Sequence, residues 1–252
     1  MKIAVSGKGG VGKSTFTSLL CKSYQQAGYK VLALDADPDA NLAATLGVPS
    51  HESIVPIVDM KELIFERTGS EPGSMGAFFK INPKVDDIPE RFSVTHNGIR
   101  LLVMGLVKTA GTGCYCPENA FIKELVGHLL LEDEEVVILD MEAGIEHLGR
   151  GTTGDVDAFI IVVEPGKRSI ETAKRVATLA GELGVKKYHV VVNKVNDDED
   201  LEFVKSFFED DTVVGAIPYS RTISLSGRGD DGVELEDMTL IDNIRIKIEK
   251  GK

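Results

Sequence analysis

Cysteine, positive charge and long apolar runs are all scarce in this chain of 252 residues. Its 28 lysine and arginine residues face 40 aspartate and glutamate residues, which gives a formal net charge of −12. That balance repels a phosphate backbone except at a local basic patch, so we expect no nucleic-acid partner. The three cysteines form no paired framework, which argues against a secreted, disulfide-held scaffold.

No apolar run approaches the roughly 20 residues needed to cross a bilayer. The first residues lead directly into a strand-like segment and lack the pattern of a signal peptide. We therefore expect a cytoplasmic protein in a reduced compartment, and we do not expect a membrane partner. With 42% hydrophobic residues, the chain can bury a substantial core without disulfides or structural metals.

Short apolar runs alternate with longer amphipathic stretches along the chain. This pattern predicts an α/β fold, a doubly wound and mostly parallel sheet flanked by helices. The predicted buried strands are residues 3–5, 31–34, 136–139, 159–163, 189–192 and 213–217. We expect a single domain over residues 1–252, in which residues 49–91 form an irregular, partly mobile insertion with one short helix near residues 59–67. Asn97-Gly98 predicts a hairpin.

A glycine-rich loop lies between the first predicted strand and the first predicted helix. Its residues 7–14 fit the phosphate-loop pattern G-x-x-x-x-G-K-[ST]. Glycines let backbone N–H groups converge on phosphate oxygens, and the helix N-terminus adds partial positive charge. We expect Lys13 to reach the β- and γ-phosphates and the Ser14 hydroxyl to bind Mg²⁺. The nucleotide-binding residues predicted here are Gly9, Gly10, Val11, Gly12, Lys13, Ser14 and Thr15.

Lys8 is a second lysine within the loop, and an ordinary phosphate loop does not need it. Residues 8–14, KGGVGKS, resemble the deviant Walker A motif K-G-G-x-G-K-[ST]. That motif is shared by the nitrogenase iron protein, the cell-division and partition ATPases and the metal-centre maturation ATPases. The resemblance implies a P-loop NTPase fold of the nitrogenase iron protein type. It also implies a homodimer in which Lys8 crosses to the partner's nucleotide and stabilises the negative charge that develops on the transferring phosphoryl group.

Three aspartates follow predicted strands, at the edge where parallel sheets bind ligands. Asp35 and Asp37 follow the second strand, and Asp140 ends an apolar run of Walker B shape. By the same resemblance, Asp37 would position the attacking water and join the two loop lysines as a catalytic residue. Asp35 would lie near the Mg²⁺ shell, and Asp140 would hold Mg²⁺ through water. Turn formation and helix capping remain the alternative for Asp35 and Asp37. We expect Glu142 to be structural or to face solvent.

The nucleotide base is predicted from a late strand. Asn193 ends that strand, and its amide suits a purine edge. GTPases carry Asp at the fourth position of N-K-x-D, whereas this chain carries Asn196, so we expect ATP. The resemblance implies that Pro218 lines the base, although a proline that merely ends a strand explains it nearly as well.

Cys114 and Cys116 are separated by one residue, a spacing that strains a disulfide ring. Close cysteines in a reduced compartment are more often metal ligands or redox centres. A tetrahedral site usually takes four protein ligands, and a two-fold dimer supplies two thiolates from each protomer. We therefore predict one thiolate-bound metal ion per dimer, with two exposed surface thiols as the alternative. The ligand set suits tetrahedral Zn²⁺, and Ni²⁺ is expected only from the resemblance described next. Cys21, by contrast, is expected to pack in the core.

Residues 114–119, CYCPEN, together with this phosphate loop resemble the nickel-insertion ATPases of carbon monoxide dehydrogenase maturation. The resemblance covers nearly the whole chain. It implies a Mg²⁺-ATP-dependent metallochaperone that hydrolyses ATP to ADP and phosphate and assists nickel insertion into the carbon monoxide dehydrogenase apo-enzyme. Two alternatives stay open. One is a spatial regulator whose ATP dimer binds a filament, or a membrane through Ile241, Ile244 and Ile248. The other is a redox partner that uses the cysteine pair.

Overall fold

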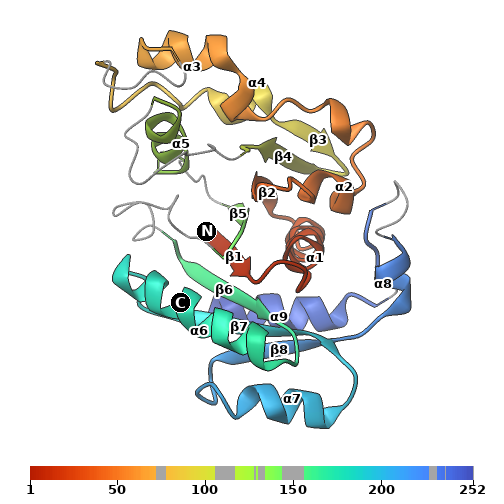
Figure 1. Ribbon diagram of the computed structural model, residues 1–252. Helices are drawn as coiled ribbons and strands as arrows, with labels where there is room; N and C mark the ends of the chain where they lie inside the picture. The colour runs from red at the N-terminus through yellow and green to blue at the C-terminus, as the bar shows by residue number, and fades with distance from the viewer. Residues whose placement is uncertain are drawn as a thin grey trace.

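A single sheet runs through the centre of the molecule (Figure 1). The computed structural model describes residues 1–71, 78–105, 117–127, 129, 134–143, 156–226, 232–235 and 237–251. Within them, eight strands form the sheet in the order β3-β4-β2-β5-β1-β6-β7-β8. The strands are β1 (Lys2–Gly7), β2 (Lys30–Ala36), β3 (Val94–His96), β4 (Ile99–Val103), β5 (Glu135–Met141), β6 (Ala158–Val163), β7 (Tyr188–Val195) and β8 (Val213–Pro218).

Neighbouring strands are parallel except β3 and β4, which pair antiparallel. Each of the predicted buried strands lies within an observed strand. In β6 every residue is buried, as expected where helices cover both faces of a parallel sheet. The predicted α/β, doubly wound fold is confirmed.

Helices cover both faces of the sheet (Figure 1). On one face α3, α5, α6 and α7 enclose a hydrophobic core that includes Phe121 and Ile170. On the other face α1, α2 and α9 enclose a second core that includes Leu20 and Leu42. The helices are α1 (Lys13–Gln26), α2 (Leu42–Leu46), α3 (Lys61–Thr68), α4 (Ile88–Phe92), α5 (Pro117–Gly127), α6 (Lys167–Glu182), α7 (Asp198–Lys205), α8 (Arg221–Ser226) and α9 (Thr239–Lys250).

The segment of residues 49–91 contains more structure than the sequence predicts. Its expected helix is α3, but α4 is a second one, and the short 3₁₀ turns η1 (His51–Ser53) and η2 (Ile57–Asp59) precede them. Pro89 lies in the first turn of α4, where proline is tolerated, so a proline-rich segment does not exclude this helix. Arg67 and Asp87 form a bidentate pair at 2.9 and 2.8 Å that joins α3 to the residue before α4.

The predicted hairpin is confirmed. Asn97 (φ 47°) and Gly98 (φ 77°) connect β3 to β4. Both residues are in the left-handed region that a two-residue hairpin turn requires, which explains the Asn-Gly pair.

The C-terminal helix α9 uses its apolar stripe within the fold. Ile241, Ile244 and Ile248 are buried against α1 and β8, with at most 1% of each residue exposed. The stripe on which the membrane alternative depended is therefore part of the core. In the described part of the chain, no helix combines the length and apolarity needed to span a bilayer.

Candidate nucleotide-binding site

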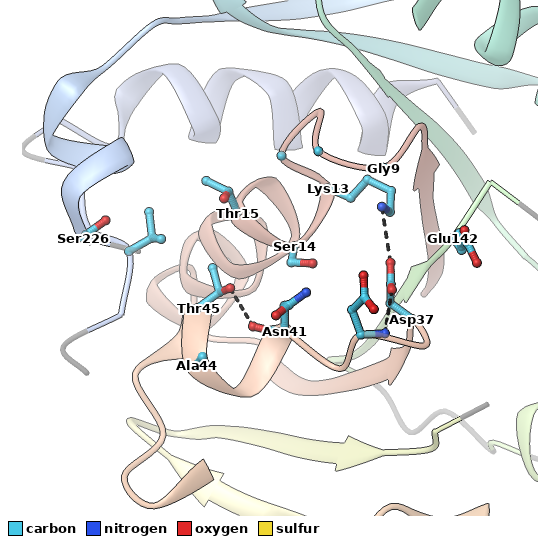
Figure 2. A pocket seen from close by; sticks show the side chains of 14 residues that line it. Gly9, Lys13, Ser14, Thr15, Asp37, Asn41, Ala44, Thr45, Glu142 and Ser226 are labelled. Carbon is cyan, nitrogen blue, oxygen red and sulfur yellow. Dashed lines mark hydrogen bonds and ion pairs between the residues drawn. The ribbon is translucent and has the colours of Figure 1, made fainter. Parts of the chain in front are cut away.

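A cavity of about 340 Å³ opens at the carboxyl edge of the sheet, beside the start of α1 (Figure 2). Six of the seven predicted loop residues line it: Gly9, Gly10, Gly12, Lys13, Ser14 and Thr15. Its other walls come from Asp37 and Asp39 after β2, from the start and body of α2, and from Glu142 after β5. Ser226 and Val233 close the side near α8.

The phosphate loop adopts backbone conformations that favour glycine. Gly10 (φ 80°) and Gly12 (φ 94°) are in the left-handed region. The N–H of Val11 donates to the oxygen of Lys8 at 3.3 Å and closes a turn around Gly10. A Cβ on Gly12 would collide with the side-chain nitrogen of Asn193. These glycines therefore serve the loop geometry that a phosphate-binding site needs.

Lys13 and Asp37 meet inside the cavity (Figure 2). The Nζ of Lys13 lies 3.3 Å from Oδ2 of Asp37, and both side chains are buried. Oδ1 of Asp37 accepts a hydrogen bond from the Asp39 N–H at 3.0 Å, which fixes the carboxylate. The cavity therefore holds an ammonium group and a carboxylate in direct contact.

Two further carboxylates lie beneath the cavity and have no exposed surface. Asp35 accepts hydrogen bonds from the N–H groups of Leu42 (2.9 Å) and Asp37 (3.2 Å). Oδ1 of Asp140 accepts from Thr17 Oγ1 at 3.4 Å. Burial raises the pKa of Asp35 to about 6 and the pKa of Asp140 to about 7. Both groups therefore hold their protons more tightly than free aspartate does.

One carboxylate oxygen of Asp140 could still bind a water or an ion. Its Oδ2 is buried and has no hydrogen-bond partner among the residues that the structure describes. A hydrogen bond from the Ser14 side chain opposes the rise in the Asp140 pKa, so the two predicted Mg²⁺ residues are neighbours. A buried acceptor that lacks a partner is costly unless a bound water or ion satisfies it. These residues therefore fit a Mg²⁺ ion held through water.

Besides Asp35, Asp140 and Asn193, three more predicted residues are not among the described residues that line this cavity. Val11 belongs to the loop but is fully buried. Lys8 and Pro218 are not among the described lining residues, and Pro218 ends β8. A lysine that acts on the partner's nucleotide need not line its own cavity, so the predicted role of Lys8 is not in conflict with this position.

The side-chain amide of Asn193 is hydrogen-bonded to the phosphate loop and to the next residue. Its Nδ2 donates to the oxygen of Val11 at 2.7 Å, and its Oδ1 accepts from the Lys194 N–H at 2.9 Å. The predicted contact with a purine stays a prediction. Lys194 was not predicted: its Nζ lies 2.6 Å from the oxygen of Gly10 and 3.1 Å from Oε2 of Glu164. The Asn-Lys pair at the end of a strand was the available signal.

Glu142 is a second residue that the sequence did not assign to the site. It is exposed, as expected, yet it lines the cavity (Figure 2). The hydroxyl of Ser6 donates to its backbone oxygen at 3.0 Å and anchors the chain after β5. Its place two residues after Asp140, at the same sheet edge, was the signal that could have revealed it.

The predicted metal ligands Cys114 and Cys116 lie outside the described residues. Cys21, on α1, is fully buried as expected, and burial raises the pKa of its thiol well above the usual range.

Comparison with known proteins decides the family. The model of the CobQ/CobB/MinD/ParA nucleotide-binding domain matches residues 2–232, which include the phosphate loop and all eight described strands. This chain belongs to that family. The carbon monoxide dehydrogenase accessory protein CooC of Rhodospirillum rubrum is 48% identical over 225 residues, which cover 88% of this chain and 85% of that one. An uncharacterized ATP-binding protein of Methanocaldococcus jannaschii is 46% identical over 226 residues, 88% of this chain and 87% of that one.

Solved structures of CobQ/CobB/MinD/ParA type share the fold. The MinC:MinD complex of Aquifex aeolicus contains a chain with a TM-score of 0.68 and 22% identity, covering 100% of this chain and 96% of that one. A plasmid partition protein of Borrelia burgdorferi bound to AMPPNP gives 0.70 at 16% identity, covering 100% and 99%. The fold is that of a P-loop NTPase. With the family match and the ATP-binding relatives, the protein is an ATPase, as predicted.

Proposed function

We propose that this protein is a cytoplasmic, homodimeric, Mg²⁺-dependent ATPase, one domain over residues 1–252, that binds a metal ion and assists nickel insertion into carbon monoxide dehydrogenase. The observation that carries the proposal is its 48% identity, over 88% of the chain, to a carbon monoxide dehydrogenase accessory protein. The metal, Ni²⁺ or Zn²⁺, is cargo rather than a resident cofactor. One ion would be held per dimer by Cys114 and Cys116 of both protomers.

The cavity supplies the groups for phosphate chemistry. A triphosphate would compete with Asp37 for the ammonium group of Lys13, because the two are 3.3 Å apart. Asp37, once released, would accept a hydrogen bond from the attacking water and orient it. The Ser14 hydroxyl and, through water, Asp140 and Asp35 would hold Mg²⁺. When bound, Mg²⁺ neutralises charge on the β- and γ-phosphates.

The charge of the cavity supports a contribution from a second protomer. Among the described lining residues, the ionisable side chains are one lysine, Lys13, and three carboxylates, Asp37, Asp39 and Glu142. A triphosphate adds more negative charge to this surplus, so its binding and its transition state require further cations. In the proposed dimer, Mg²⁺ and the partner subunit's Lys8 supply them.

The same dimer would link ATP to the metal. A closed, ATP-bound dimer would bring two pairs of thiolates to one axis, and hydrolysis would favour opening and release. Thiolate ligands suit a tetrahedral Zn²⁺ ion, while Ni²⁺ often prefers square-planar geometry. Nickel is therefore proposed from the relationship to the accessory protein and not from the ligand set.

Metal titration with and without Mg²⁺-ATP tests the proposal. Wild-type protein is expected to bind one Ni²⁺ or Zn²⁺ per dimer, and Cys114→Ala/Cys116→Ala is expected to lose that site. Cys21→Ala is the matched control, because Cys21 is buried in α1 and should leave metal binding unchanged. Equal affinity and stoichiometry in the double variant would show that the site assignment is wrong. A visible absorbance band after anaerobic preparation would instead favour a redox cluster.

A further inference from the structure

The end of β7 contacts the phosphate loop through two side chains. Lys194 donates from Nζ to the oxygen of Gly10 at 2.6 Å. The preceding residue, Asn193, donates from Nδ2 to the oxygen of Val11 at 2.7 Å. Two successive side chains thus hold two successive peptide oxygens of the loop. We call Asn193 and Lys194 the β7 brace.

The brace fixes more than the two oxygens. A peptide group is planar, so holding its oxygen also sets the direction of the N–H on the following residue. For the oxygens of Gly10 and Val11, those N–H groups belong to Val11 and Gly12. The Val11 N–H closes the turn onto Lys8, and Gly12 lines the cavity at the start of α1. The brace therefore fixes the directions of two N–H groups of the loop in the nucleotide-free protein.

Lys194 itself is held in an unfavourable backbone conformation. Its φ of 60° is in the left-handed region, which lysine adopts rarely. The ladder between β7 and β8 is irregular at the same place, between Asn193 and Val195. Strain of this kind persists where surrounding contacts enforce it, and it is common at functional sites. Here it directs the side chain back over the loop.

Glu164 keeps the ammonium group in place. Its Oε2 lies 3.1 Å from Nζ of Lys194. Glu164 follows β6, and its N–H donates to the hydroxyl of Ser169 in the first turn of α6 at 3.1 Å. A positive charge is thereby anchored beside a cavity whose described lining has more carboxylates than lysines.

We propose that Lys194 is a positioning residue of the ATPase. It presets the phosphate loop through the oxygen of Gly10, and it sets the affinity for the polyphosphate of ATP or ADP independently of the base. The proposal does not depend on the metal cargo. It concerns a contact that each protomer makes alone.

Isothermal titration with Mg²⁺-ATP, Mg²⁺-ADP and inorganic tripolyphosphate tests this role. Lys194→Met is expected to weaken all three by about tenfold, the effect of losing one charged hydrogen bond. Its KM for ATP should rise more than its kcat falls, and Lys194→Arg should recover at least half of the lost affinity on a logarithmic scale. Lys205→Met is the matched control, because that exposed lysine on α7 pairs only with Glu202 in the described contacts.

Glu164→Gln separates the two contacts of Lys194. It removes the ion pair but leaves the bond to Gly10 available, so its loss of affinity should be clearly smaller than that of Lys194→Met. Thermal unfolding of the nucleotide-free variants reports any loss of the fold itself. The proposal is overturned if Lys194→Met binds the three probes within about twofold of wild type. It is also overturned if Glu164→Gln loses as much affinity, or if Lys194→Arg recovers none.

Discussion

The Nζ of Lys13 lies 3.3 Å from Oδ2 of Asp37, and both side chains are buried. The lysine of the phosphate loop is thus paired with the carboxylate that is expected to orient the attacking water. Because one ammonium group cannot keep this pairing unchanged and also engage a triphosphate, ATP binding and the release of Asp37 become linked. Binding of ATP to Lys13 would therefore free the Asp37 carboxylate to orient the attacking water.

Asp37→Asn should separate binding from hydrolysis. Asparagine keeps an oxygen for the Asp39 N–H, removes the charge that competes for Lys13 and cannot act as a base. We expect ATP affinity to be equal or up to about tenfold higher, while turnover falls by about 100-fold or more. Titration of Mg²⁺-ATP and steady-state phosphate release measure the two effects.

Lys13→Met is the reciprocal control, since it removes the phosphate ligand and should abolish tight ATP binding. Equal weakening of ATP binding by Asp37→Asn and Lys13→Met would show that Asp37 does not compete with ATP for Lys13.

Asp140→Asn should stabilise the nucleotide-free protein at high pH and abolish hydrolysis. Burial raises the pKa of Asp140 to about 7, with Asp35 and Asp37 adding to the rise and with Ser14 and Lys13 opposing it. The folded state therefore binds this proton more tightly than the unfolded state, and the group's contribution to stability falls as pH rises from about 4 to about 7. At pH 8 a charged carboxylate is buried with one oxygen, Oδ2, that has no hydrogen-bond partner among the described residues. Asparagine removes the charge and keeps an acceptor for Thr17.

Denaturant unfolding at pH 5 and pH 8 measures this effect. The variant is expected to gain on the order of 2 kcal/mol over wild type at pH 8, and much less at pH 5. Mg²⁺ should stabilise wild type but not the variant in the presence of ATP, because the Mg²⁺-holding carboxylate is lost. A variant less stable than wild type at pH 8 would contradict the assignment of Asp140 as a buried, unsatisfied group.

Asn193→Ala distinguishes the predicted purine contact from the observed contact with the loop. The described hydrogen bonds of this amide go to Val11 and Lys194. We therefore expect a similar loss of affinity, about fivefold to tenfold, for ATP, GTP and inorganic tripolyphosphate. Competition titrations with the three ligands measure it. A loss confined to ATP would show that the side chain reads the base instead.

The strands, the hairpin turn and the phosphate loop could be predicted from short stretches of sequence, because interactions between nearby residues determine them. Buried strands are continuous apolar runs, Asn97-Gly98 adopts the conformations a tight hairpin needs, and the glycines of the loop adopt positive φ. Asp35 and Asp37 could be placed at the cavity because the carboxyl ends of parallel strands converge at one edge.

The missed residues depend on contacts between distant parts of the chain. Lys194 reaches Gly10 across 184 positions of sequence, and its role follows from a strained backbone that no composition pattern reveals. Ser226 and Val233 also line the cavity, although they are far from the phosphate loop in the sequence. The raised pKa of Asp140 could not be predicted from the sequence either, because it arises mainly from complete burial of the side chain in the fold.

Mixing two inactive variants tests the central claim, a dimer in which Lys8 acts on the partner's nucleotide. Lys8→Ala and Asp37→Asn should each be inactive as homodimers. A mixed dimer has one intact site, where the Lys8→Ala protomer supplies Asp37 and its partner supplies Lys8. After subunit exchange at equal concentrations, we predict about one quarter of wild-type ATPase activity, because about half of the dimers are mixed. If the mixture stays as inactive as its components while light scattering shows mixed dimers, Lys8 does not act across the interface.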